Sequence, residues 1–393
     1  MTSEQDALAA VLAKVGPLPN ERATLLDSLG RFAARDLFAS RPLPAFDNSA
    51  MDGYAVRAES CRVGATLRVV GEQPAGADLC LTIAAGEALR IFTGAPLPAG
   101  ADAVIMQEEV TREGETIRVH GDVERGEFIR GKGCDLAAGQ KIVTRGELLS
   151  APLLALLASQ GLAQLEVGAQ PRIAIISTGD ELAQPGSVPR AGQIFESNAI
   201  MLQALAMRAG ALVRLVEHCP DDLERMKELF LRGLGNDALV VSGGVSVGEH
   251  DLVKPALRAL GAEIDLWRVA IKPGKPFLFG RAGACFIFGL PGNPVSAFVT
   301  FLKFVRPALL KMSGASDENL ALREVPARLA VEAVNDDERP HYLRGRLEGE
   351  IFTPTGRQES HALFALSRAN ALLQIAAQSR LPAGATVMVA LLA

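Results

Sequence analysis

The sequence predicts a multidomain α/β plus β protein. We expect a central three-layer α/β/α domain with a mostly parallel sheet, a β-rich inserted lobe and a small C-terminal β-barrel. Between residues 171 and 318, apolar strand-like runs alternate with helix-like segments, as is typical of right-handed βαβ units whose helices cover both faces of a sheet. Residues 55–145 contain short alternating runs separated by glycine turns, and a similar pattern returns in 319–393. Short strands with polar turns are typical of β-lobes and small barrels.

The first 40 residues are expected to be helical. Apolar residues keep helical spacing over 8–15, and a second helix is expected around 25–38. Residues 41–54 are rich in Pro, Asp, Asn and Gly, which predicts a structured loop. The apolar run 148–165 is interrupted by proline and glutamines. Since it is shorter than the ~20 apolar residues that span a bilayer, it predicts a packed helix.

The β-rich lobe and the α/β region can be divided into elements. In the lobe, strands are expected at 67–70, 88–92, 103–106 and 116–119. In the α/β region, strands are expected at 172–177, 211–216, 237–242 and 284–290. Helices are expected at 197–210, 221–235, 252–261 and 293–310, with Ser197 and Asn293 as N-caps and Gly210 just after a C-terminus.

Composition narrows the functional class. The chain has 393 residues, a net charge of −5 and 49% hydrophobic residues, which is ordinary for a soluble protein and argues against a nucleic-acid binder with a global basic field. The five cysteines are scattered without a CxxC pair, so a reducing cytoplasm is expected and a disulfide framework is not. The histidines lack the spacing of a zinc site, so any metal is expected to be a hard, carboxylate-bound cation such as Mg²⁺.

Four loops at predicted strand ends carry unusual polar residues: STGDEL at 177–182, SGGVSVGEHD at 242–251, IKPGKPF at 271–277 and GLPGNPVS at 289–296. In open α/β sheets, ligands bind beyond the carboxyl ends of the strands. We therefore expect these loops to gather at one edge of the sheet.

The contents of these loops suit a phosphorylated ligand and a metal ion. Glycines and serine hydroxyls can donate to an anion, lysines supply positive charge, and a helix N-terminus near Asn293 offers further N–H groups. Glu181 and Asp251 are anionic, so beside a phosphate they need a cation between them, most simply Mg²⁺. The residues expected to bind phosphate are Ser242, Gly243, Gly244, Ser246, Pro291, Asn293, Lys272 and Lys275. No Walker A or GxGxxG pattern is present.

Six long motifs in this chain resemble those of one family. They are FDNSAMDGYAV, IFTGAPLPAGADAVIMQE, STGDEL, SGGVSVGEHD, IKPGKPFLFG and GLPGNPVSAF. Their order and spacing are similar to those of the molybdopterin molybdenumtransferases, the MoeA-type family related to the C-terminal domain of gephyrin, over essentially the whole chain.

The resemblance implies the last step of molybdenum cofactor synthesis: adenylylated molybdopterin binds, its phosphoanhydride is cleaved with Mg²⁺, AMP leaves and molybdate is inserted. It assigns the acidic and polar residues of the active cleft to Asp52, Thr93, Asp135, Glu181, Asp221 and Asp251, with Glu181 and Asp251 at the metal. It places the lysines of the family's active cleft at Lys272 and Lys275, and the residues on the oxyanion side of the cleft at Arg344 and Ser360. Asp222 is the alternative to Asp221 in that register.

The resemblance also implies a cytoplasmic homodimer whose active sites lie between subunits. A molybdopterin adenylyltransferase is a possible partner, while no nucleic acid or membrane is expected. The implied domains are a discontinuous linker and dimerisation domain (1–45 and 136–170), the inserted lobe (46–135), the molybdopterin-binding α/β domain (171–318) and the barrel (319–393).

Three rival functions remain open at this point. The first is the same reaction with tungstate, which has the charge and nearly the size of molybdate. The preceding adenylylation step is another, although the extra lobes argue against it. A non-catalytic scaffold like gephyrin's related domain is the third, and the complete set of acidic residues and lysines argues against it.

Overall fold

The computed structural model describes residues 1–245 and 252–392. The chain forms two compact units, one made of residues 1–35, 145–158 and 162–393 and the other of 36–144 and 159–161. The finer division into four domains stays a prediction.

A six-stranded sheet forms the centre of the first unit, in the order β16-β13-β17-β20-β19-β18. The strands β16 (Leu212–Cys219), β13 (Arg172–Thr178), β17 (Ala238–Ser242) and β20 (Cys285–Leu290) are parallel. At one edge, β19 (Leu278–Ala282) and β18 (Glu263–Trp267) run antiparallel. The predicted mostly parallel sheet is confirmed, and its continuous apolar runs are buried on both faces as such strands require.

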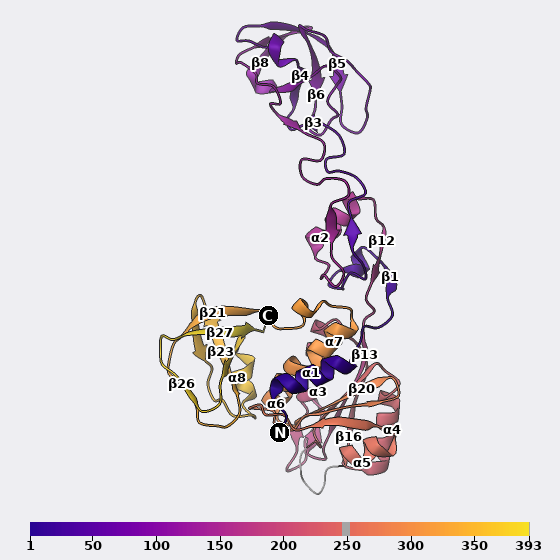
Figure 1. Cartoon of the computed structure of the whole chain (residues 1–393), viewed down its shortest axis with the longest axis vertical. Helices are drawn as coiled ribbons and strands as arrows, with labels where there is room; N and C mark the ends of the chain where they lie inside the picture. The colour runs from indigo at the N-terminus through magenta and orange to yellow at the C-terminus, as the bar shows by residue number, and fades with distance from the viewer. Residues whose placement is uncertain (246–251, 393) are drawn as a thin grey trace. The chain divides into compact units, whose positions relative to one another are not determined.

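Helices cover both faces of this sheet (Figure 1). One face packs against α1 (Glu4–Lys14), α3 (Asn198–Arg208), α6 (Pro294–Thr300) and α7 (Arg306–Met312). The other packs against α4 (Leu223–Gly233) and α5 (Val253–Ala259). The predicted three layers are therefore confirmed. The expected helix 293–310 is divided by a π-helical turn, Phe301–Val305, just before Pro307, which lacks the N–H that would continue the α-helical pattern.

The helix expected at 25–38 is wrong. The segment follows β1 (Glu21–Thr24) and contains one 3₁₀ turn (Leu26–Ser28) and the strand β2 (Leu37–Phe38). Within the segment, Phe32 and Ala33 form isolated bridges with the distant Leu148 and Val167, the latter at the end of β12 (Gln164–Val167), which also pairs with β1. These pairings and a left-handed Gly30, with φ of +73°, override the local apolar spacing. The helix expected within 148–165 is confirmed as α2 (Ala151–Ser159).

The second unit contains another six-stranded sheet, in the order β7-β4-β6-β5-β9-β8. These strands are β4 (Gly53–Val56), β5 (Thr66–Gln73), β6 (Glu87–Ile91), β7 (Ala103–Met106), β8 (Val110–Glu113) and β9 (Thr116–Val119). Beside the sheet, β3 (Asn48–Ser49) pairs with β10 (Ile129–Arg130), and β2 pairs with β11 (Lys141–Val143). The β-rich lobe predicted from the sequence is confirmed.

The C-terminal segment of the first unit closes into a five-stranded barrel. Its strands are β21 (Glu324–Leu329), β23 (His341–Glu348), β24 (Ile351–Pro354), β25 (Ala371–Ile375) and β27 (Thr386–Leu391). A short pair, β22 (Ala333–Asn335) with β26 (Ser379–Leu381), and the helix α8 (Leu363–Ser367) complete it. Gly345 lies under the Phe352 ring, where a Cβ would come within 2.1 Å of the ring. The predicted small barrel is confirmed.

Within residues 1–245 and 252–392, none of the helices is both long and apolar enough to cross a membrane.

Candidate functional site

A cavity of about 690 Å³ lies at the carboxyl edge of the parallel sheet. Residues that follow β13, β17 and β20 line it, as does Pro276 from the predicted loop at 271–277. The expectation that these loops gather at one edge is confirmed. The predicted site residues that line the cavity are Glu181, Asp221, Ser242, Gly243, Gly244, Pro291 and Asn293.

The acidic side of the cavity follows β13. Gly179 has φ of +137°, and a Cβ there would lie 2.2 Å from the Glu181 carboxylate, so this carboxylate lies directly over the glycine. The Asp221 N–H donates to Asp180 Oδ1 at 3.1 Å. Asp180 therefore orders the segment that carries Asp221. It was missed from the sequence, although it stands next to Glu181 in STGDEL.

The glycines after β17 serve the packing of the loop. Gly243 and Gly244 have φ of +93° and +63°, and a Cβ at either would come within 2.7 Å of Thr178 or Val253. The Gly243 N–H donates to the Leu290 carbonyl at 3.0 Å. The expectation that this N–H is available for an anion is therefore wrong, because the neighbouring strand end already uses it.

The fit of a metal ion rests on the carboxylates that line the cavity. Ser246 and Asp251 lie outside the described residues, so the pairing of Asp251 with Glu181 stays a prediction. Within 1–245 and 252–392, no group of three or more His, Cys, Asp or Glu side chains is placed to hold a metal by itself. Glu181 and Asp221 nevertheless both line the cavity. Two carboxylates fit Mg²⁺, which commonly binds one or two carboxylates together with water and phosphate oxygens.

The N-terminus of α6 is joined to the barrel domain. Asn293 is its N-cap, but the Asn293 side chain donates to Ser360 Oγ at 3.0 Å instead of capping the helix. The Val295 N–H donates to the Ser360 carbonyl at 3.0 Å. The expectation of a free helix end needs correction here, since the loop of Ser360 occupies part of it. His361, in the same loop, lines the cavity.

Arg344 has a different environment from the one expected of an oxyanion ligand. Its side chain is 0% exposed, and its guanidinium donates to the carbonyls of Arg357 (2.7 Å), Gln358 (3.0 Å) and Glu359 (3.3 Å). Burial lowers the pKa of Arg344 to about 10. In this structure Arg344 holds the loop that carries Ser360.

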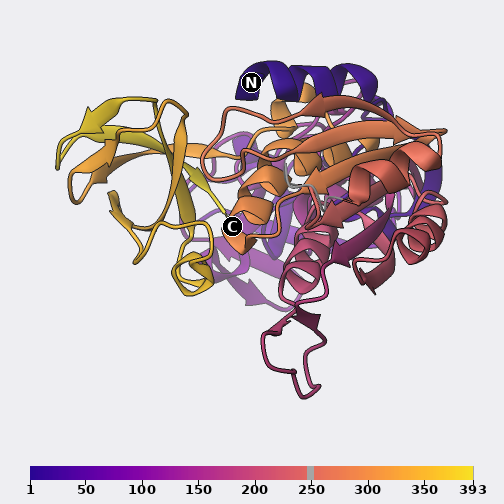
Figure 2. The same ribbon diagram turned by 90° about the horizontal axis from the view of Figure 1, so that it is seen from below.

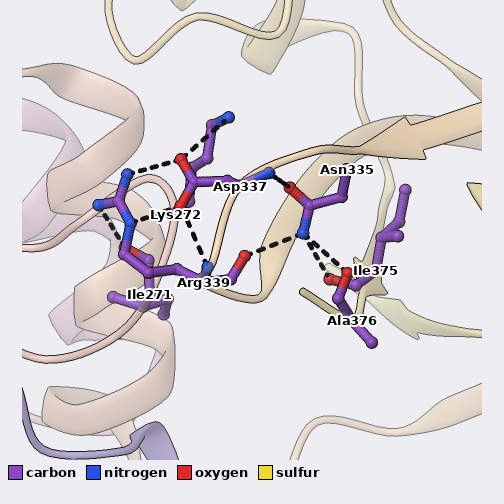
Figure 3. Close-up of polar contacts among 7 residues, drawn as sticks. All are labelled: Ile271, Lys272, Asn335, Asp337, Arg339, Ile375 and Ala376. Atoms are coloured by element: carbon purple, nitrogen blue, oxygen red, sulfur yellow. Dashed lines mark hydrogen bonds and ion pairs between the residues drawn. The ribbon is translucent and has the colours of Figure 1, made fainter. Parts of the chain in front are cut away.

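Lys272 lies in a polar network between the α/β domain and the barrel (Figure 3). Its Nζ is 3.5 Å from Asp337 Oδ2, and Arg339 binds both oxygens of the same carboxylate at 2.9 Å. Hydrogen bonds from Arg339 hold the pKa of Asp337 well below its usual range. Lys275 is exposed. Neither Lys272 nor Lys275 is among the described residues that line the cavity.

The second unit carries the remaining predicted residues. Asp52 Oδ1 accepts from the Thr93 N–H at 2.7 Å and from the Thr93 hydroxyl at 2.8 Å. These donors lower the pKa of Asp52, which is solvent-exposed. The structure thus brings Asp52 and Thr93 together. Asp135 is exposed in a loop, where its N–H donates to the Leu43 carbonyl.

Sequence reasoning missed two buried polar residues in the cavity wall, Glu196 and Asn198. Ser197 was expected to cap α3 and is its N-cap by position, but its side chain makes no capping bond. Glu196 Oε1 accepts from the Ala199 N–H instead. The tripeptide ESN directly before a helix was the available signal, since Glu and Asn side chains can both satisfy free N–H groups.

Comparisons with known proteins give a consistent result along the chain. Family models match as "MoeA N-terminal region (domain I and II)" over residues 2–161, "Probable molybdopterin binding domain" over 174–311 and "MoeA C-terminal region (domain IV)" over 326–392. A molybdopterin molybdenumtransferase of Haemophilus influenzae is 34% identical over 95% of this chain and 94% of its own length. Molybdopterin molybdenumtransferase 2 of Mycobacterium tuberculosis is 38% identical over 89% of each chain. The crystal structure of the molybdopterin biosynthesis MoeA protein from Pyrococcus horikoshii OT3 is 31% identical, with a TM-score of 0.84 over 100% of both chains.

Proposed function

Because the chain belongs to the MoeA family of molybdopterin molybdenumtransferases, we propose that it inserts molybdate into adenylylated molybdopterin, with cleavage of the phosphoanhydride and release of AMP. It is a transferase of molybdenum cofactor biosynthesis. The observation that carries the proposal is the cavity at the strand ends, where Glu181, Asp221 and Ser242 converge.

The phosphate-bearing part of the substrate is proposed to bind between the ends of β13 and β17. Ser242 accepts a hydrogen bond from Asn198 at 3.0 Å, so its own hydroxyl hydrogen can point to a phosphate oxygen. Glu181, with Asp221 and Asp251, would hold Mg²⁺, which when bound supplies positive charge against the phosphate oxygens. Lys275 and Lys272 are proposed to offset charge on the bridging phosphates, and Lys272 must first leave Asp337.

Arg344 and Ser360 are proposed to act together on the molybdate side. Arg344 would act indirectly, by holding the 357–359 carbonyls and with them the Ser360 hydroxyl near Asn293. Tungstate shares the chemistry that such a site recognises, so it belongs in the assay beside molybdate.

We also propose a cytoplasmic homodimer in which the two subunits share each active site, with a molybdopterin adenylyltransferase as a possible partner. In this proposal the partner subunit supplies Asp52 and Thr93, an ordered and exposed pair of one carboxylate and one hydroxyl that is suited to act on a substrate.

The insertion reaction is tested with purified protein, adenylylated molybdopterin and Mg²⁺, by measuring AMP release with molybdate, with tungstate and with neither. We expect oxyanion-dependent release by the wild type and a loss of about 10²–10³-fold in Glu181→Gln, because one preorganised charge at the reacting phosphate is removed. Glu217→Gln is the matched control, since Glu217 lies on β16, pairs with Arg232 of α4 and is not among the described residues of the cavity. No AMP release by the wild type with either oxyanion would contradict the enzymatic proposal and favour a scaffold.

A further inference from the structure

The cavity wall at the start of α3 contains buried oxygen acceptors that the phosphate chemistry does not use. Glu196 is 4% exposed and Asn198 is 8% exposed, and both line the cavity. Buried polar atoms are nearly always hydrogen-bonded in folded proteins. Acceptors left free in a cavity wall therefore point to a ligand with matching donors.

The hydrogen bonds of these two residues fix which atoms remain free. Glu196 Oε1 accepts from the Ala199 N–H at 2.9 Å, whereas its Oε2 has no partner among the described residues. Asn198 Nδ2 donates to Ser242 Oγ at 3.0 Å and to the Gly292 carbonyl at 2.7 Å. A carbonyl can only accept, so the orientation of the amide is set and Asn198 Oδ1 is its free end. Within the same described ranges, Oδ1 also has no partner.

An apolar edge lies beside these oxygens. Ile194 and Phe195 form β15, which pairs with β14 (Leu182–Ala183), and both residues line the cavity. Their side chains are 61% and 49% exposed. The connecting segment 184–192 is exposed and projects from the domain (Figure 2). A partly exposed aromatic ring at a cavity edge is suited to stack against a flat heterocycle.

We propose that Glu196 and Asn198 form a ring-recognition subsite that accepts hydrogen bonds from the amino-pyrimidine edge of the pterin, with Phe195 against the face of the ring. This subsite rests on the proposed function for the identity of its ligand. The pterin edge carries two adjacent donors, the 2-amino group and N3–H, which match two free acceptor oxygens. The adenine amino group is flanked by ring nitrogens that only accept, so adenine would place acceptors against Glu196 or Asn198.

Binding of isolated rings tests this subsite without the reaction. The probes are pterin, lumazine, which has a carbonyl in place of the 2-amino group, and AMP. Each is titrated against the full chain by calorimetry. The key variant is Glu196→Gln. It keeps an oxygen for the Ala199 N–H and replaces the free acceptor with an NH₂ donor of the same size.

We expect the wild type to bind pterin at least about tenfold more tightly than lumazine, because a charge-assisted acceptor faces a donor in one ring and an acceptor in the other. In Glu196→Gln this ratio should fall to about one or reverse, with AMP affinity unchanged and the circular dichroism of the wild type retained. Phe195→Leu should weaken the binding of pterin and of lumazine equally, so the ratio of their affinities should stay the same. Glu217→Gln is again the control.

Two results would overturn the subsite: a wild type that does not prefer pterin, or a folded Glu196→Gln that keeps the wild-type ratio. A loss confined to AMP would also overturn it, because the ring at Glu196 would then be adenine. If the pterin preference depends on Glu196 but no AMP is released in the activity assay, the subsite stands and only the insertion reaction fails.

Discussion

The loop of Asp52 in the β-rich unit and the segment around Arg344 in the barrel differ in how they hold a motif residue. Asp52 is exposed, and it is held by two hydrogen bonds from one neighbour, Thr93. Arg344 is fully buried, and its hydrogen bonds go to three backbone carbonyls of one loop. Both were assigned to the site by the same kind of resemblance. A motif therefore identifies which residues belong to a site. Burial then decides whether such a residue can contact a ligand or instead shapes a loop that contacts it.

The protonation behaviour of the two residues agrees with this division. Hydrogen bonds from Thr93 lower the pKa of Asp52, so it is an anion at neutral pH and acts as an acceptor or a charge rather than a proton donor. Burial lowers the pKa of Arg344 to about 10, which still leaves it charged at neutral pH. Its charge is offset by carbonyl dipoles that it also orders.

The difference in burial between Arg344 and an exposed arginine on the same strand predicts a large difference in stability when each is replaced. Arg344→Met should destabilise the protein by about 3–5 kcal/mol, because it leaves three carbonyls of the 357–359 loop without their donors. Urea unfolding followed by circular dichroism measures this. Arg346→Met is the matched control: Arg346 is exposed and, among the described residues, its side chain pairs only with Glu348, at 2.5 Å, so its loss should cost no more than about 1 kcal/mol. Equal, small effects at both positions would show that Arg344 is not structural.

Asp52→Asn should give the opposite pattern. Its amide oxygen can still accept from Thr93, so unfolding should change little, while AMP release should fall by about 10²-fold because a charge at the substrate is lost. Mixing this variant with Glu181→Gln sharpens the result. If sites are shared between subunits, mixed dimers should restore about a quarter of wild-type activity, because half of the dimers are mixed and each keeps one intact site. No recovery after proven subunit exchange would contradict shared sites.

Much of the fold could be predicted because its signals are local or periodic. The buried runs that became β13, β17 and β20 predict a parallel sheet by composition alone, and the rule on strand ends then predicts the place of the cavity. The helix expected at 25–38 failed because Phe32 and Ala33 pair with Leu148 and Val167, which lie more than 100 residues further along the chain. Such a distant partner leaves no mark in a short window of sequence.

The candidate site was predicted less well for a related reason. Residue types show which groups can bind phosphate, but not which are already engaged. The Gly243 N–H is used by Leu290, and the Val295 N–H is used by Ser360. Glu196 is the opposite case: the sequence suggests that its carboxylate is fully used, because a carboxylate before a helix is usually an ordinary cap. Glu196 differs from such a cap in its burial and in an oxygen that has no partner in the part of the chain that the structure describes.

His341 is a buried titratable group on β23, three residues before Arg344. Burial lowers its pKa from 6.5 to about 4, and the nearby charges of Lys272, Arg344 and Arg339 act in the same direction while Asp337 opposes them. The unfolded chain therefore binds a proton between about pH 6.5 and 4 that the folded chain does not. The resulting stability is fully present above pH 6.5 and is lost as the pH falls through about 4.

The difference between the two pKa values corresponds to about 2–3 kcal/mol, allowing for partial solvent screening. We expect the free energy of unfolding of His341→Gln to fall less than that of the wild type between pH 7 and pH 4, by about this amount. His120→Gln is the control, because His120 is exposed and bonds only Thr111 among the described side chains. Parallel pH profiles for the wild type and His341→Gln would mean that His341 is hydrated in solution. In that case the segment beside Arg344 would be open to water like the loop of Asp52, and the contrast between the two regions would not hold.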